Sequence, residues 1–116
     1  MKMAAKKIAV AFFATESGAE PVREWLRSLS REDQKKIGDD IRTAEFGWPI
    51  GMPVCRPLGK GLYEVRTNLN RRIARVLFTI EGDHMVLLHG FIKKAQTTPA
   101  SDLELARSRL RTYRRS

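Results

Sequence analysis

The sequence predicts an α+β domain in which one mostly antiparallel sheet carries an αα-hairpin on one face. Three observations predict it: two helical patterns follow each other near the N-terminus, three short strand-like runs fill the stretch 58–94, and another helical pattern ends the chain. With a first strand before the helices, the expected order is β-α-α-β-β-β followed by a C-terminal helix. At 116 residues, 1–116 is expected to be a single domain with a modest core.

The first expected strand lies in the apolar run 8–14. The basic residues before it could suggest a secretory signal, but the run is short and Glu16 and Glu20 follow closely. No run reaches the roughly 20 apolar residues that cross a bilayer. The protein is therefore expected to be neither exported nor membrane-bound. Its single cysteine, Cys55, fits a reducing cytoplasm.

The next two patterns predict helices over 19–29 and 30–46. Ser30 is a suitable N-cap for the second helix, and Gly47 and Pro49 predict its end. Two helices that share a tight corner pack as an αα-hairpin. Their apolar stripes are formed by Val22, Trp25, Leu26 and Leu29, and then by Ile37, Ile41 and Ala44.

The connector 47–61 is rich in glycine and proline. Pro49, Pro53 and Pro57 forbid a helix and discourage an internal strand, so a long surface crossing from helix to sheet is expected. Lys60, near the end of the connector, would extend the charged face of the sheet at its edge.

Strands are predicted over 62–67, 71–81 and 84–93, with short turns that make neighbours antiparallel. Alternation divides their side chains between an apolar face and a charged face. The apolar set, expected under the helical hairpin, is Tyr63, Val65, Ala74, Val76, Phe78, Ile80, Val86, Leu88, Gly90 and Ile92. The other set, expected to be exposed, is Leu62, Glu64, Arg66, Arg71, Ile73, Arg75, Leu77, Thr79, Met85, Leu87, His89, Phe91 and Lys93.

After Gln96 the chain is predicted to form its last helix. Thr98 can cap this helix and Pro99 fits its first position. Arginines surround its apolar stripe and interact favourably with the C-terminal end of the helix dipole. The stripe is Leu103, Ala106, Leu110 and Tyr113.

The charge balance points to an acidic partner. The 22 Lys and Arg against 13 Asp and Glu give a net charge of +9, which favours association with nucleic acid or another acidic surface. The alternative is that the charge serves only solubility. A sheet with one covered face and one cationic face is a platform for a polyanion. Metal-ligand spacing and a glycine-rich phosphate loop are both absent from the sequence, so neither a metal nor a cofactor is expected.

The chain resembles the phage-derived HigB branch of the RelE/ParE toxin superfamily in four segments that keep their order and spacing: PVREWLRSLS, FGWPIG, LGKGLYEVR and LLHGFIKKAQTTP. The resemblance spans about residues 12–113 and implies the β-α-α-β-β-β fold with a terminal helix. It also implies a cytoplasmic type II toxin, a metal-independent endoribonuclease that cuts mRNA in the ribosomal A site. The implied partner is a HigA-like helix-turn-helix antitoxin from the same operon.

The resemblance also implies which residues carry the activity. In RelE-like toxins, basic residues on the second and third strands and at the end of the last one surround the scissile phosphate. Arg66, Arg75 and Lys93 match these positions, and all three belong to the charged set. Contacts with RNA or the ribosome are expected from Lys60, Arg71, Arg72 and Lys94, of which Arg72 points to the covered face by strict alternation.

RNA cleavage without metal needs a base for the 2′-hydroxyl, stabilisation of the phosphate and an acid for the leaving 5′-oxygen. The three cations could stabilise charge. Glu64 is the candidate base because it is the one carboxylate in the charged set, and His89 could serve as acid or base because histidine titrates near neutral pH. The alternatives are that Glu64 only forms ion pairs and that His89 is half-buried packing.

Two other functions stay open. Glu64 stands where RelE has a lysine, and Ala95 and Thr97 remove a hydroxyl and a cation from the ending KKTQKTP that is frequent in the family. These departures fit a toxin-like protein that binds RNA or an antitoxin without cutting. The other alternative is a ParE-like inhibitor of DNA gyrase, although a protein target does not need three converging cations.

Overall fold

The computed structural model describes residues 8–49, 51, 54–93 and 97–115. These residues form β1 (Ala9–Phe12), α1 (Pro21–Arg27), α2 (Arg31–Gly47), β2 (Cys55–Gly59), β3 (Leu62–Leu69), β4 (Arg72–Glu81), β5 (His84–Lys93) and α3 (Ala100–Arg115). The strands make one sheet in the order β1-β5-β4-β3-β2, in which β1 is parallel to β5 and the other pairs are antiparallel. The predicted α+β class is confirmed. In the described ranges, no helix is long and apolar enough to span a membrane.

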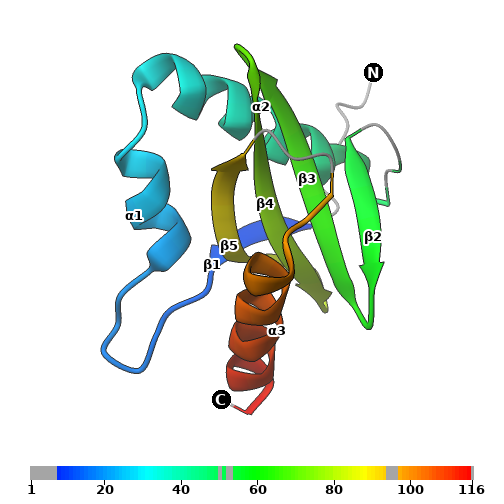
Figure 1. The fold of residues 1–116 in the computed structure, drawn as a ribbon. Helices are drawn as coiled ribbons and strands as arrows, with labels where there is room; N and C mark the ends of the chain where they lie inside the picture. Colours follow the sequence, from blue (N-terminus) through cyan, green and yellow to red (C-terminus); the bar gives the residue numbers. More distant parts are fainter. Residues whose placement is uncertain (1–7, 50, 52–53, 94–96, 116) are drawn as a thin grey trace.

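The helices α1 and α2 pack on one face of the sheet, as predicted. α1 begins at Pro21, and the Ser30 hydroxyl caps α2 by accepting a hydrogen bond of 3.1 Å from the Asp33 amide. In Figure 1, α2 passes behind the sheet and α1 lies to its left. The hairpin core includes Val22, Ile37, Ile41, Ala44, Val65, Ala74, Val76 and Phe78, with Trp25, Leu26, Leu29, Tyr63, Ile80 and Ile92 packed against them.

α3 covers part of the opposite face, which the sequence predicted to be exposed. Figure 1 shows α3 in front of the sheet, on the side away from α2. Because the hairpin already occupies the first face, the apolar stripe of α3 is buried against the second. The prediction of an open charged face is therefore wrong where α3 lies. The α3 core contains Phe13, Leu62, Leu77, Val86, Leu88, Phe91, Ala106 and Leu110, with Leu103 and Tyr113 packed against them.

A β-bulge in β5 reverses the predicted faces of the first part of this strand. Leu77 of β4 lies opposite His89, but the next residue, Phe78, lies opposite Leu87, so that Leu88 is the extra residue. One inserted residue moves every side chain on one side of it to the other face. The hairpin core accordingly receives Met85 and Leu87, and the α3 core receives Val86 and Leu88, the reverse of the prediction.

Beyond the bulge, the predicted face of β5 is correct. A Cβ atom added to Gly90 would lie only 2.4 Å from two ring atoms of Trp25, so the indole of α1 occupies the space that a side chain would need. Trp25 is thus a packing residue, in its predicted place on the apolar stripe.

The connector contains an additional strand that the sequence did not predict. β2 pairs antiparallel with β3, and Pro57 lies opposite Tyr63. Proline is tolerated here because β2 is an edge strand. At the other end of β3, the turn falls on Asn70 and Arg71, and Arg71 has a φ of +59°, so it belongs to the turn rather than to β4.

Candidate functional site

The predicted cations meet where the middle strands pass beneath the start of α3. The sheet register places Arg66 of β3 opposite Arg75 of β4, and Arg75 opposite Phe91 of β5. The Arg75 guanidinium carbon and the Lys93 ammonium lie 6.0 and 5.7 Å from the centre of the Phe91 ring. The prediction that Arg66, Arg75 and Lys93 share one face of the sheet is therefore confirmed.

Their exposure is not as predicted, because Arg75 and Glu64 are fully buried. The segment before α3 lies over them: Arg75 Nη1 donates a hydrogen bond of 3.2 Å to the Thr97 carbonyl, and the Thr98 hydroxyl donates to Glu64 Oε2. The predicted capping position of Thr98 is wrong, because α3 begins at Ala100 and its N-cap is therefore Pro99. The Pro99 carbonyl accepts the first helical hydrogen bond, from Leu103.

Glu64 lies between two guanidinium groups. Its Oε1 atom is 3.7 Å from Nε of Arg66 and 3.9 Å from Nε of Arg75. Burial lowers the pKa of Arg75 below its ordinary value, while the negative charge of Glu64 acts in the opposite direction. This carboxylate therefore compensates charge in a buried position, which fits the ion-pair alternative. Arg66 remains partly exposed, at 19% of its side chain, and Lys93 at 45%.

A second carboxylate, Asp102 in the first turn of α3, binds His89 and Lys93 together. Its Oδ1 atom is 2.7 Å from His89 Nε2, and its Oδ2 atom accepts a hydrogen bond of 2.9 Å from Lys93 Nζ. Burial raises the pKa of Asp102, but the hydrogen bonds and positive charges of His89 and Lys93 outweigh burial, so the pKa lies below its ordinary value. The carboxylate thus holds both candidate residues against α3.

The other edge of the His89 ring faces Arg109. Arg109 Nη1 lies 3.5 Å from His89 Nδ1 and donates a hydrogen bond of 2.8 Å to the Leu88 carbonyl. Because arginine only donates, the arrangement fits, for a neutral ring, the tautomer in which Nδ1 accepts and Nε2 carries the proton. Phe91 stacks on the ring with 5.4 Å between centroids. His89 is therefore oriented on three sides.

Sequence reasoning missed Asp102 and Arg109 as partners of this site. They stand seven residues apart, about two helical turns, so they share one face of α3. That spacing was visible in the sequence. The face of the sheet on which α3 packs was not.

The remaining predicted contacts are scattered. Arg72 lies on the hairpin side, as alternation predicted, where its Nη2 is 3.1 Å from a carboxylate oxygen of Asp33 in α2. Arg71 is exposed in its turn, and Lys60 is exposed in the turn between β2 and β3. Lys94 lies outside the described residues, as does Ala95.

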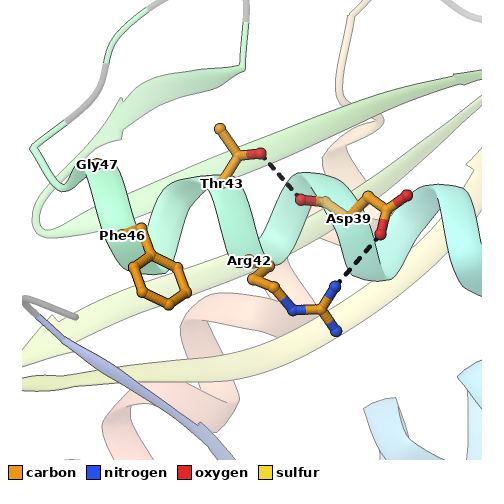
Figure 2. A pocket seen from close by; sticks show the side chains of 5 residues that line it. All are labelled: Asp39, Arg42, Thr43, Phe46 and Gly47. Atoms are coloured by element: carbon orange, nitrogen blue, oxygen red, sulfur yellow. Dashed lines mark hydrogen bonds and ion pairs between the residues drawn. The ribbon is translucent and has the colours of Figure 1, made fainter. Parts of the chain in front are cut away.

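Two hollows elsewhere contain none of the predicted catalytic residues. The first, of about 580 Å³, is formed on α2 alone, where Figure 2 shows Phe46 and Arg42 side by side along the helix. The second, of about 250 Å³, lies at the β2 edge and includes Cys55. Burial raises the pKa of the Cys55 thiol to about 11, so the thiol is protonated and a poor nucleophile. Within the described ranges, no three His, Cys, Asp or Glu side chains gather as metal ligands would.

Comparison with known families places the chain in a described family. A family model described as "Phage derived protein Gp49-like (DUF891)" matches residues 24–111, which is well over half of the chain. The match contains α2, β2, β3, β4 and β5 whole, and α3 as far as residue 111, so Asp102 and Arg109 fall within it. No curated protein matches the chain.

Proposed function

Because the chain belongs to the phage-derived Gp49-like family, a toxin-like family of the RelE kind, we propose that it is the toxin of a type II toxin–antitoxin system. The proposed activity is HigB-like: cleavage of mRNA in the A site of the translating ribosome. A HigA-like helix-turn-helix protein would neutralise it. The observation that carries the proposal is the meeting of Arg66, Arg75 and Lys93 on one sheet face, next to the His89–Asp102 pair.

Arg66 and Lys93 are the cations that an RNA strand would contact directly, since both reach the surface. In the proposed reaction the 2′-hydroxyl gives its proton to a base while its oxygen attacks phosphorus. The bond to the 5′-oxygen breaks and that oxygen takes up a proton, so that a 2′,3′-cyclic phosphate and a 5′-hydroxyl result. Negative charge grows on the phosphate oxygens in the transition state. Fixed positive groups beside those oxygens lower the barrier without having to reorganise.

His89 is the stronger candidate for proton transfer: Asp102 holds Nε2, so Nδ1 would take the proton once RNA displaces the long contact of 3.5 Å with Arg109. A base must come within hydrogen-bond reach of the proton that it removes, and the Glu64 carboxylate is fully buried. We therefore assign Glu64 a positioning role, in which it holds Arg66 and Arg75. Asp102 would orient the His89 ring, as a carboxylate does beside a catalytic imidazole.

The test is primer extension on a reporter mRNA during induced expression. The proposal expects cuts in phase with codons that appear only when the message is translated. Arg66→Ala and Lys93→Ala should each reduce cutting about 10²–10³-fold, the typical loss when one stabilising donor is removed. Lys35→Ala is the matched control because it removes one positive charge from the outer surface of α2, where the side chain is 76% exposed. Equal cutting by all three variants would overturn the proposal.

The second candidate is a binding protein without catalysis. The burial of Glu64 and Arg75, together with the contacts of His89 to Asp102 and Arg109, favours it. An intact message, with RNA or antitoxin binding retained, would support this reading. Intact message with loss of DNA supercoiling would instead indicate a ParE-like gyrase inhibitor.

A further inference from the structure

A cationic groove lies at the end of α3 remote from Asp102. It has a volume of about 220 Å³ and is formed between α3 and the turn that joins β2 to β3. We call it the turn groove. Its lining residues are Lys60, Arg107, Leu110, Arg111 and Arg114.

Helical periodicity brings the three arginines together. Arg107, Arg111 and Arg114 are spaced i, i+4 and i+7, so they follow one face of α3. Arg107 fixes this face to the end of β2, next to the turn, because its Nη2 donates a hydrogen bond of 3.1 Å to the Leu58 carbonyl. The groove is therefore a consequence of how α3 docks, and Lys60 projects from the same turn.

The turn itself is held in a defined shape. Lys60 has a φ of +54° and Gly61 a φ of +80°, conformations that the Thr79 hydroxyl supports by donating a hydrogen bond of 2.7 Å to the Gly61 carbonyl. A Cβ atom on Gly61 would lie 3.0 Å from Arg114 Nη2, so glycine permits the close approach of this guanidinium. A fixed turn limits the freedom that the cations lose when they bind a ligand.

Two carboxylates lie at the rim of the groove, whereas four cations line it. Glu104 is 3.5 Å from Arg111 Nη2, and Glu81 is 3.0 Å from Arg114 Nε. These pairs are at the surface, where ion pairs contribute little net free energy. An anion with several oxygens can therefore share the guanidinium donors. Guanidinium groups suit phosphate because two N–H groups can bind two oxygens at once.

We infer that the turn groove binds backbone phosphates of RNA, as a second site that does no chemistry. The inference rests on the proposed function for the choice of RNA as the polyanion. An acidic protein is the less suitable occupant, because protein interfaces bury apolar and aromatic side chains at their centre. Among the lining residues described here, the apolar one is Leu110. It is already buried in the α3 core, with 4% of its surface exposed, so it offers no such centre.

The groove and the candidate site would contact different phosphates. The groove residues Arg107 and Arg114 are five and twelve residues beyond Asp102 on α3, which corresponds to about 8 and about 18 Å along the helix. A nucleotide bound at Arg66 and Lys93 therefore leaves the groove free. The groove would hold the RNA that flanks the cut, or the folded RNA around it, and increase affinity without regard to sequence.

The salt dependence of RNA binding tests the inference. The probe is a 2′-O-methylated RNA hairpin, which cannot be cut because its 2′-oxygens are blocked, and fluorescence anisotropy gives the affinity across a salt series. Each lost phosphate contact makes the slope of log affinity against log salt shallower by about 0.9 for a duplex. The double variant Lys60→Gln/Arg111→Gln should therefore show a slope shallower by about 2.

The matched control is Lys35→Gln/Arg42→Gln, which removes the same charge from α2 and also releases an acidic partner, Asp39. Its slope should stay at the wild-type value. Equal slopes for the groove variant and the control would overturn the inference. So would tighter binding of polyglutamate than of RNA with the same dependence on Lys60 and Arg111, which would indicate an acidic protein. Primer extension reads cleavage independently, so failure of the nuclease proposal and failure of the groove can be told apart.

Discussion

Replacing Glu64 by glutamine separates a structural role of this residue from a catalytic one. The side chain is fully buried, with Nε of Arg66 and Nε of Arg75 at 3.7 and 3.9 Å from Oε1. Glutamine keeps the volume, and its amide oxygen can still accept the hydrogen bond from Thr98. The change removes one negative charge and places an amide NH2 group, a donor, where Oε1 faced the two guanidinium groups.

The expected loss of stability follows from these distances. At about 4 Å and an effective dielectric constant of about 20, each charge pair is worth roughly 4 kcal/mol before dehydration is counted. Dehydration of the buried ions cancels much of this attraction, but in the variant Arg75 stays buried and loses its counter-charge. Removal of one partner from a buried pair typically costs about 3–5 kcal/mol. We expect about 3 kcal/mol for Glu64→Gln, because the two distances are long for ion pairs.

Urea unfolding followed by circular dichroism measures this difference. The control is Glu104→Gln, because Glu104 lies at a similar distance, 3.5 Å, from Arg111 but is 72% exposed. That variant should change the free energy of unfolding by about 0–1 kcal/mol. The double variant Glu64→Gln/Arg75→Gln should recover part of the loss, since it leaves no charge uncompensated between these two residues. If Glu64→Gln is no worse than Glu104→Gln, and cleavage falls about 10²–10⁴-fold, Glu64 is the base and the positioning role is refuted.

Two further predictions concern packing and pH. Gly90→Ala should destabilise the fold by about 1–3 kcal/mol, because the new Cβ atom would overlap the Trp25 ring. Gly38→Ala in α2, where a Cβ atom would have nothing within 4 Å, should stabilise the fold by about 0.5–1 kcal/mol. Thermal unfolding compares the two variants, and equal shifts of Tm would contradict the packing of Trp25 on Gly90. The pKa of Asp102 is below its ordinary value of 3.8, so its ionised form stabilises the folded state above that pH, and this contribution is lost as pH falls through the folded pKa. Asp102→Asn should therefore unfold with less dependence on acid pH than wild type, and an identical acid profile would count against the His89–Asp102–Lys93 contacts.

The sequence predicts the strands and the hairpin because their patterns are strong, but it carries no signal for the bulge. Met85, Val86, Leu87 and Leu88 are all apolar, so the run fits either face equally well. His84 stands at the exposed start of the strand, and the next polar residue, which would show the face of the strand interior, is His89. Counting back from there by strict alternation reverses the first part of β5.

The burial of the site could not be predicted for a different reason. Alternation correctly places Glu64, Arg66 and Arg75 on one face, but it does not say what covers that face. The covering groups, Thr97 and Thr98, lie in a connector whose sequence indicates only a helix start. Their contacts depend on where α3 docks, which is a tertiary property.

The parallel pairing of β1 with β5 has a consequence for synthesis. Ala9 lies opposite His84, so β1 can join the sheet only when the intervening chain of about 75 residues has been synthesised. The candidate site needs Asp102 and Arg109 as well, which emerge later still. Since non-local pairings form slowly, we expect β3, β4 and β5 to pair in nascent chains before β1 joins the sheet and before the site is complete. Protease protection of ribosome-arrested chains that end before α3 would show this; a fully protected sheet including β1 at that length would contradict it.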